Sequence, residues 1–133
     1  MHSPLFLLAA ACDFTAVFVH GVAGYRTMIP PLIPDRLFAT RAFGDEDMTR
    51  RLFIVGWHLV TATFFCSAVA LTLLGLGLVN DAALPRFIGA LHASFVALPL
   101  FIVAGRLPVA IRRPTPIAFF TCLGTVAVVG WLG

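Results

Sequence analysis

The chain has 133 residues, of which 60% are hydrophobic and only 11% are charged, and its mean hydropathy is +1.00. A soluble globular domain has about 25% charged residues, so this composition excludes an ordinary water-soluble globule and predicts an integral membrane protein. Nine arginines, no lysine and six acids give a net charge of +3; because the arginines lie between apolar runs, we expect them to set membrane orientation and expect no nucleic-acid partner.

Four apolar runs divide the chain, at about residues 4–24, 52–79, 87–105 and 116–132. A membrane-spanning helix needs about 20 apolar residues, and a lone segment in lipid satisfies its backbone groups as a helix. We therefore predict a single integral membrane domain over residues 1–133, an all-α bundle of four transmembrane helices.

The first run carries two ionisable residues, Asp13 and His20, within its apolar sequence. They are seven residues apart, so two helical turns place them on one face. An ionisable residue inside a span is costly to bury and is therefore a functional candidate by default.

The segment after the first run has structure signals of its own. Pro30, Pro31 and Pro34 oppose a straight continuation of the first helix. Residues 35–43 mix arginines with apolar side chains, which predicts a short amphipathic helix at the membrane interface, with a partner-binding segment as the alternative. Residues 45–47 are Asp-Glu-Asp, typical of a capped, acidic start to the second helix.

Two more histidines lie in the later runs, His58 in the second and His92 in the third. Counted from the flanking arginines at about 1.5 Å per residue, His20 and His58 lie level, about 9 to 10 Å from one edge of the membrane. The same count places Asp13 and His92 level, about 20 Å deep. The sequence thus predicts two polar layers inside the bundle.

The arginines predict the orientation of the helices. Eight of the nine lie in the segments after the first and third runs, and only Arg86 lies on the opposite side. Loops rich in arginine stay in the cytoplasm, so we expect a bacterial inner membrane protein with both termini outside and the interfacial helix in the first cytoplasmic loop.

Two level histidines on neighbouring helices are the geometry that ligates a b-type haem from both sides. His20 and His58 are the candidate ligands, and Arg26 and Arg51 are the candidate partners of the haem propionates. Three alternatives stay open. One layer could bind a metal ion, Asp13 and His92 could form a proton or quinone site, or the polar groups could pair internally and only fix the helix register.

The segments from Val19 to Pro30 and from Trp57 to Thr61 carry a resemblance to a family. With their V-H-x-x-x-G and W-H-L-V sequences they resemble small four-span bacterial membrane proteins without an established activity. In that family's pattern, Ser is common where this chain has Gly21 and Glu where it has Tyr25. The resemblance implies the four-span topology and singles out His20 and His58.

No paired nucleophile and base, phosphate-binding loop or soluble-cofactor fingerprint occurs in the sequence. We therefore expect an accessory or assembly subunit of a membrane complex that contacts lipids and other subunits or itself, rather than an enzyme. A structural subunit without cofactor is the main alternative, and an enzyme acting on lipid or quinone is the third.

Overall fold

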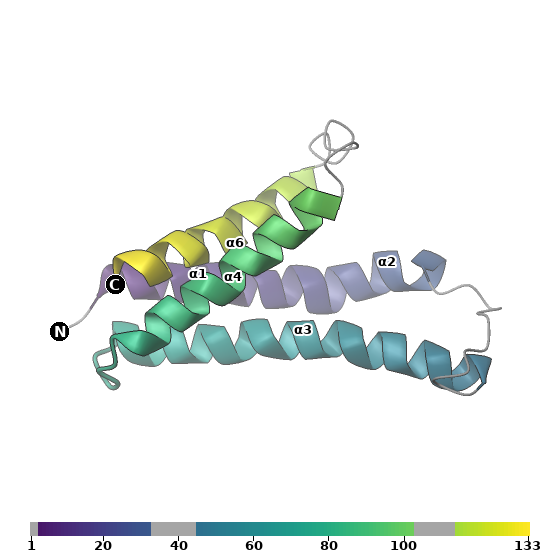
Figure 1. The fold of residues 1–133 in the computed structure, drawn as a ribbon, viewed down its shortest axis with the longest axis horizontal. Coiled ribbons are helices and arrows are strands. Elements are labelled where there is room, and N and C mark those ends of the chain that lie inside the picture. Colours follow the sequence, from purple (N-terminus) through teal and green to yellow (C-terminus); the bar gives the residue numbers. More distant parts are fainter. Residues whose placement is uncertain (1–2, 33–44, 103–113) are drawn as a thin grey trace.

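The chain folds into long helices. A computed structural model of the protein describes residues 3–32, 45–102 and 114–133, and no strand occurs in these ranges. The helices in chain order are α1 (Pro4–Phe18), the π-helical segment η1 (Val19–Gly24), α2 (Tyr25–Leu32), α3 (Glu46–Gly75), α4 (Ala83–Ile102) and α6 (Pro114–Leu132) (Figure 1). The predicted all-α class is confirmed, whereas the predicted interfacial helix at residues 35–43 lies outside the described residues.

The helices pack in a fixed order. α1 packs against both α3 and α6, and α6 packs against α4. α1 and α3 are antiparallel, because Ser3 N donates to Gly75 O at 3.0 Å at one end and His20 contacts Thr61 further along. Both chain ends and the connection from α3 to α4 lie at the same end of the molecule, and α4 runs at an angle to α3 (Figure 1).

The first helix is longer than the apolar run predicts. It continues from α1 through η1 and α2 as far as Leu32, so the expectation that it ends near Gly24 is wrong. Pro30 and Pro31 lie in its last turn. Their missing N–H groups remove only the final backbone hydrogen bonds there, so the prolines mark where the helix ends rather than breaking it earlier.

The start of α3 follows the sequence prediction. Asp45 is its N-cap, and the carboxylate accepts a hydrogen bond from Met48 N at 2.8 Å. Glu46 and Asp47 lie in the first turn, where negative charge opposes the positive end of the helix dipole. The Arg51 Nε–H donates to Asp47 at 2.7 Å, at the i,i+4 spacing that brings two side chains together on one helix face.

The ends of the other helices shift by a few residues. α4 begins four residues before the predicted Phe87, because Asp81 Oδ1 accepts from Ala83 N at 2.7 Å and from Leu84 N at 3.1 Å and so caps the helix. α6 begins at Pro114 instead of Pro116. Proline is favoured in the first turn, where its missing N–H has no partner to lose.

α3 ends at Gly75, four residues before the predicted Val79. Gly77 N donates to Leu74 O at 3.0 Å and Leu78 N donates to Leu73 O at 2.9 Å, the two bonds of a Schellman motif. The motif needs a left-handed residue after the helix, and Gly77 supplies it with a φ of 69°.

This turn gives a stability prediction. We expect Gly77→Ala to lower the free energy of unfolding by about 1 to 2 kcal/mol, because a Cβ disfavours the left-handed conformation. Gly56→Ala is the matched control on α3, where an added Cβ meets nothing within 4 Å, and it should raise stability by about 0.5 to 1 kcal/mol. Thermal unfolding in detergent micelles compares the two variants, and an equal effect of both would contradict the assigned turn.

Among the described residues, two helices are long and apolar enough to cross a membrane, namely the 27 residues Pro4–Pro30 and the 30 residues Glu46–Gly75. Only 22% and 17% of their most apolar windows are buried inside the protein. Their outer faces expose large apolar side chains, among them Leu8, Phe18, Phe53, Leu59 and Phe65. α4 and α6 contain shorter apolar stretches, Ala83–Pro99 and Pro116–Leu132.

Candidate functional site

Asp13 on α1 and His92 on α4 form a buried polar pair. His92 Nε2 lies 2.8 Å from Asp13 Oδ1, and both side chains have an exposed fraction of 0%. The two residues are 79 positions apart in the sequence, so the contact ties the first helix to the third long one. The structure therefore brings Asp13 and His92, which were predicted to share one layer, into direct contact.

The hydrogen bonds fix how many protons the pair holds. His92 Nδ1 lies 2.9 Å from Ile88 O, and a carbonyl oxygen only accepts, so Nδ1 carries a proton. The contact between Nε2 and Oδ1 needs exactly one more proton, on either the imidazole or the carboxyl group. In both cases the net charge of the pair is zero, which removes most of the cost of burying it.

One atom of this pair has no partner. Asp13 Oδ2 is buried and makes no hydrogen bond among the described residues. A buried polar atom without a hydrogen bond costs about 1 to 3 kcal/mol, so this oxygen is an unusual feature of the interior.

The surroundings of the pair are apolar. The Phe64 ring centroid lies 5.7 Å from the His92 ring, and that of Phe95 lies 6.0 Å from it. Buried apolar side chains form two clusters. One includes Ala9, Ala10, Leu71 and Val126, and the other includes Ala16, Phe64 and Leu123. A hydrogen bond is stronger in an apolar interior than in water, so these surroundings strengthen the contact between Asp13 and His92.

His20 lies in a second cluster, against α3. Its ring stacks on the Trp57 ring with centroids 4.0 Å apart and planes 11° apart. Trp57 Nε1 donates to the His20 carbonyl at 3.1 Å, and His20 Nδ1 lies 2.9 Å from Thr61 Oγ1. The side chain of His20 is thus fixed on two sides by one face of α3.

The tautomer of His20 depends on where Thr61 directs its one hydroxyl proton. Thr61 Oγ1 lies 3.4 Å from Trp57 O and 2.9 Å from His20 Nδ1. When the hydroxyl donates to Trp57 O, it accepts from a protonated Nδ1, and Nε2 of the neutral imidazole then has a free lone pair. A nitrogen in that state is able to bind a metal ion or accept a proton.

Glycines in η1 make room for this cluster. A Cβ at Gly21 would lie 2.6 Å from Thr61 Cγ2, and a Cβ at Gly24 would lie 2.8 Å from Trp57 Cζ2. Single π-helical turns within α-helices occur often at functional sites, and here the turn spans Val19–Gly24 around His20. Small residues and altered winding together let α3 approach the first helix closely.

The other predicted site residues have surroundings different from those of His20. His58 is exposed, and its ring lies 5.1 Å from that of Tyr25, so the two histidines contact different neighbours. Arg26 is exposed on α2. Arg51 is exposed on α3 and already pairs with Asp47.

Sequence reasoning missed the role of Trp57. Its position in an apolar run favours an interfacial anchor, but in the structure its ring stacks on His20 and its N–H donates to the His20 carbonyl. The contact between His20 and Thr61 is one of the internal pairings that the sequence left open. A usable signal was present, because Trp57 and Thr61 are i,i+4 neighbours on one helix face and Gly21 and Gly24 supply small residues opposite.

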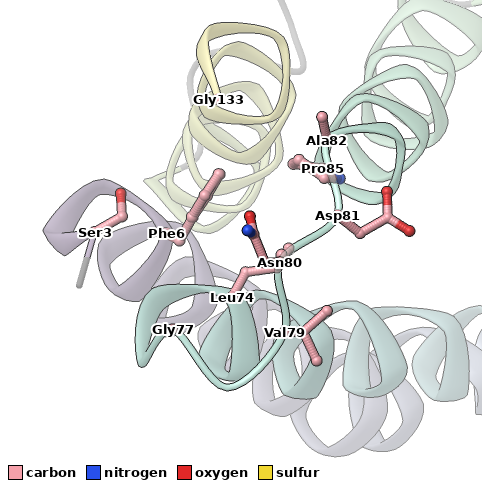
Figure 2. A pocket seen from close by; sticks show the side chains of 10 residues that line it. All are labelled: Ser3, Phe6, Leu74, Gly77, Val79, Asn80, Asp81, Ala82, Pro85 and Gly133. Atoms are coloured by element: carbon pink, nitrogen blue, oxygen red, sulfur yellow. The ribbon is translucent and has the colours of Figure 1, made fainter. Parts of the chain in front are cut away.

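A pocket of about 550 Å³ lies at the end of the molecule where both termini meet. Figure 2 shows the Asn80 side chain directed into the space between the helix ends, whereas Asp81 points away from it. Asp81 is the one ionisable residue among the described residues that line this pocket, and it already caps α4.

Metal binding needs several ligands at one point. Within the described residues, no group of three or more His, Cys, Asp or Glu side chains comes together. A metal ion in this part of the chain would depend on His20 or on the Asp13–His92 pair with ligands from elsewhere.

Comparison of the chain with protein-family models, with curated protein sequences and with solved structures finds no match. The side chains themselves therefore carry the functional argument.

Proposed function

We propose that the protein is a small integral membrane subunit with four spanning helices, which serves in the assembly or support of a larger bacterial inner membrane complex. The supporting features are the two long apolar helices with mostly exposed windows and large apolar side chains on outer faces. Exposed apolar surface of this extent marks contact with lipid or with protein partners.

The Asp13–His92 pair is the observation that carries this proposal. It is fully buried and neutral overall, and it joins two helices from opposite halves of the chain. Within lipid, a polar pair of this kind links helices, because either group alone would face hydrocarbon unpaired. The pair thus links α4 to α1 by an interhelical hydrogen bond.

The membrane location and orientation are tested by fractionation and by fusions. The protein should remain in the membrane pellet after alkaline carbonate extraction. Alkaline phosphatase fused to either terminus should be active, because we propose that both ends lie outside the cytoplasm. Release of the protein into the soluble fraction would contradict the proposal, and inactive fusions at both ends would contradict the orientation.

A second candidate function is electron transfer through haem b. The contact between His20 Nδ1 and Thr61 favours it, since an axial ligand commonly donates its other ring N–H to a neighbouring group, and Nε2 then has a free lone pair. His20 would supply one ligand and His58 the other, with Arg26 and Arg51 near the propionates. Haem would supply one-electron chemistry, while Trp57 and Thr61 hold the His20 ring in place.

Haem binding gives a prediction with an all-or-none readout. Protein purified from cells supplied with a haem precursor should show a Soret band, and His20→Ala and His58→Ala should each abolish it. Thr61→Val is expected to retain the band but shift the reduction potential, because it removes only the hydrogen bond to the ligand. A colourless wild-type sample without bound metal would exclude both cofactor functions and leave the subunit role.

A further inference from the structure

A groove of about 440 Å³ runs between α3 and α4. It exists because α3 packs mainly on α1 and α4 mainly on α6, and α4 diverges from α3 after their short connection (Figure 1). One face of α3 and one face of α4 line it, with Leu59, Ala62, Thr63, Cys66, Ser67 and Ala70 on the first and Leu84, Phe87, Ile88 and Leu91 on the second. Its volume falls in the usual range of small-molecule sites, about 300 to 1,000 Å³.

Ser67 is the unexpected member of the groove. The residue is only 5% exposed, and its hydroxyl makes no hydrogen bond among the described residues. Serine and threonine in helices normally donate to a backbone carbonyl of the preceding turn, as Thr63 does to Leu59 O at 2.9 Å and Ser94 does to Leu91 O at 2.7 Å. The hydroxyl of Ser67 is thus a free donor in an apolar groove.

The rest of the lining selects the chemistry of the ligand. No Asp, Glu, Lys, Arg or His occurs among the described residues that line the groove, so these residues would leave a charged head group uncompensated. The α3 wall contains small residues, Ala62, Ser67 and Ala70, while the α4 wall contributes Phe87 and Leu91. This apolar lining favours a neutral ligand, and a ring would gain aromatic contact with Phe87.

We propose that this groove binds an isoprenoid quinone, with one quinone carbonyl accepting a hydrogen bond from the Ser67 hydroxyl and the apolar tail lying toward Leu59. The inference rests on the proposed membrane location, which gives such a lipid access to the groove. The groove lies close to the buried acid–base pair, because Ile88 lines the groove and its backbone carbonyl is the acceptor of His92.

Cys66 supplies a native reporter of occupancy, because it lies in the groove and its thiol is free and exposed. Decylubiquinone is a suitable probe, since its ring is fully substituted and does not add thiols. In detergent-purified protein we expect decylubiquinone to slow maleimide alkylation of Cys66, quantified by peptide mass spectrometry, in a saturable manner.

Variants test each part of the site. Ser67→Ala should raise the Kd for decylubiquinone by roughly 3- to 10-fold, the value of one hydrogen bond, and Ala62→Leu should remove protection by filling the groove. Ser94→Ala and Ala90→Leu are the matched controls on α4, since Ser94 is bonded to its own helix and Ala90 is exposed outside the groove lining. Both controls should bind as the wild type does.

Three results would overturn the proposal. Equal protection by undecylbenzene, which lacks a carbonyl, would show a crevice for any lipid chain. Disulfide cross-linking of Cys66 between two copies in native membranes, with no effect of quinone, would show that a second copy fills the groove. Unchanged alkylation of Cys66 at saturating decylubiquinone would show that no quinone binds, while carbonate extraction would still report the membrane location independently.

Discussion

Asp13→Leu is expected to lower the free energy of unfolding by about 1 to 3 kcal/mol, because it leaves the buried Nε2 of His92 without a hydrogen-bond partner. His92→Leu should cost a similar amount, since it leaves both carboxyl oxygens of Asp13 unpaired in an apolar interior. Thermal or denaturant unfolding in detergent micelles, followed by circular dichroism, measures both losses.

The double variant distinguishes a coupled polar pair from two side chains that pack independently. Replacing both partners of a buried polar pair by apolar groups of similar shape is nearly neutral or stabilising. We therefore expect Asp13→Leu/His92→Leu to be close to the wild type in stability. Its loss in the free energy of unfolding should be far smaller than the sum of the two single losses. Additive losses would show that Asp13 and His92 contribute independently and would contradict the assigned contact.

A conservative variant tests the proton count. In Asp13→Asn the side-chain amide can donate to Nε2 of a neutral His92 whose Nδ1 still donates to Ile88. Hydrogen bonds between membrane helices contribute about 0.6 kcal/mol on average, so Asp13→Asn should remain much closer to wild type than Asp13→Leu. A loss as large as that of Asp13→Leu would show that the charge on the carboxylate, and not the shared proton, stabilises the contact.

Local signals in the sequence were sufficient for much of the fold. The apolar runs locate all the described long helices, and the Asp-Glu-Asp turn locates the start of α3 at Glu46. Depth counting from arginines was enough to predict one layer for Asp13 and His92, because a helix rises by a constant amount per residue. These properties depend on a single helix at a time.

Features that depend on two helices together were not predictable. The π-helical turn at Val19–Gly24 and the stacking of Trp57 on His20 arise from close approach of α3, which periodicity does not encode. The groove between α3 and α4, which Ser67 lines, depends on the angle at which α4 crosses. Gly77 was hidden because a glycine in an apolar run is equally compatible with a helix interior.

α4 and α6 cross with little room for added volume. A Cβ at Gly130 would lie 2.7 Å from both Cα and N of Gly89 and would also collide with the Pro85 carbonyl. These are backbone atoms, so no side-chain rotation relieves the overlap, and the two helices must separate. We expect Gly130→Ala to lower stability by about 1 to 3 kcal/mol, as overpacking does.

The same helix offers the control. An added Cβ at Gly124 meets nothing within 4 Å, so Gly124→Ala should raise stability by about 0.5 to 1 kcal/mol through the better helix propensity of alanine. A difference in sign between two Gly→Ala changes on α6 isolates the crossing from general effects of glycine. Equal effects in thermal unfolding would show that α4 and α6 are not in close contact at Gly89.

The crossing also bears on the buried pair, because His92 lies three residues after Gly89 on α4. Separation of α4 from α6 in Gly130→Ala should shift His92 away from Asp13 and weaken their 2.8 Å contact. The losses from Gly130→Ala and Asp13→Leu should then sum to more than the loss in the combined variant, since both act on the same hydrogen bond. Strict additivity would mean that α4 changes its tilt at Gly89 while His92 stays in place. The Asp13–His92 contact would then be independent of the crossing of α4 and α6.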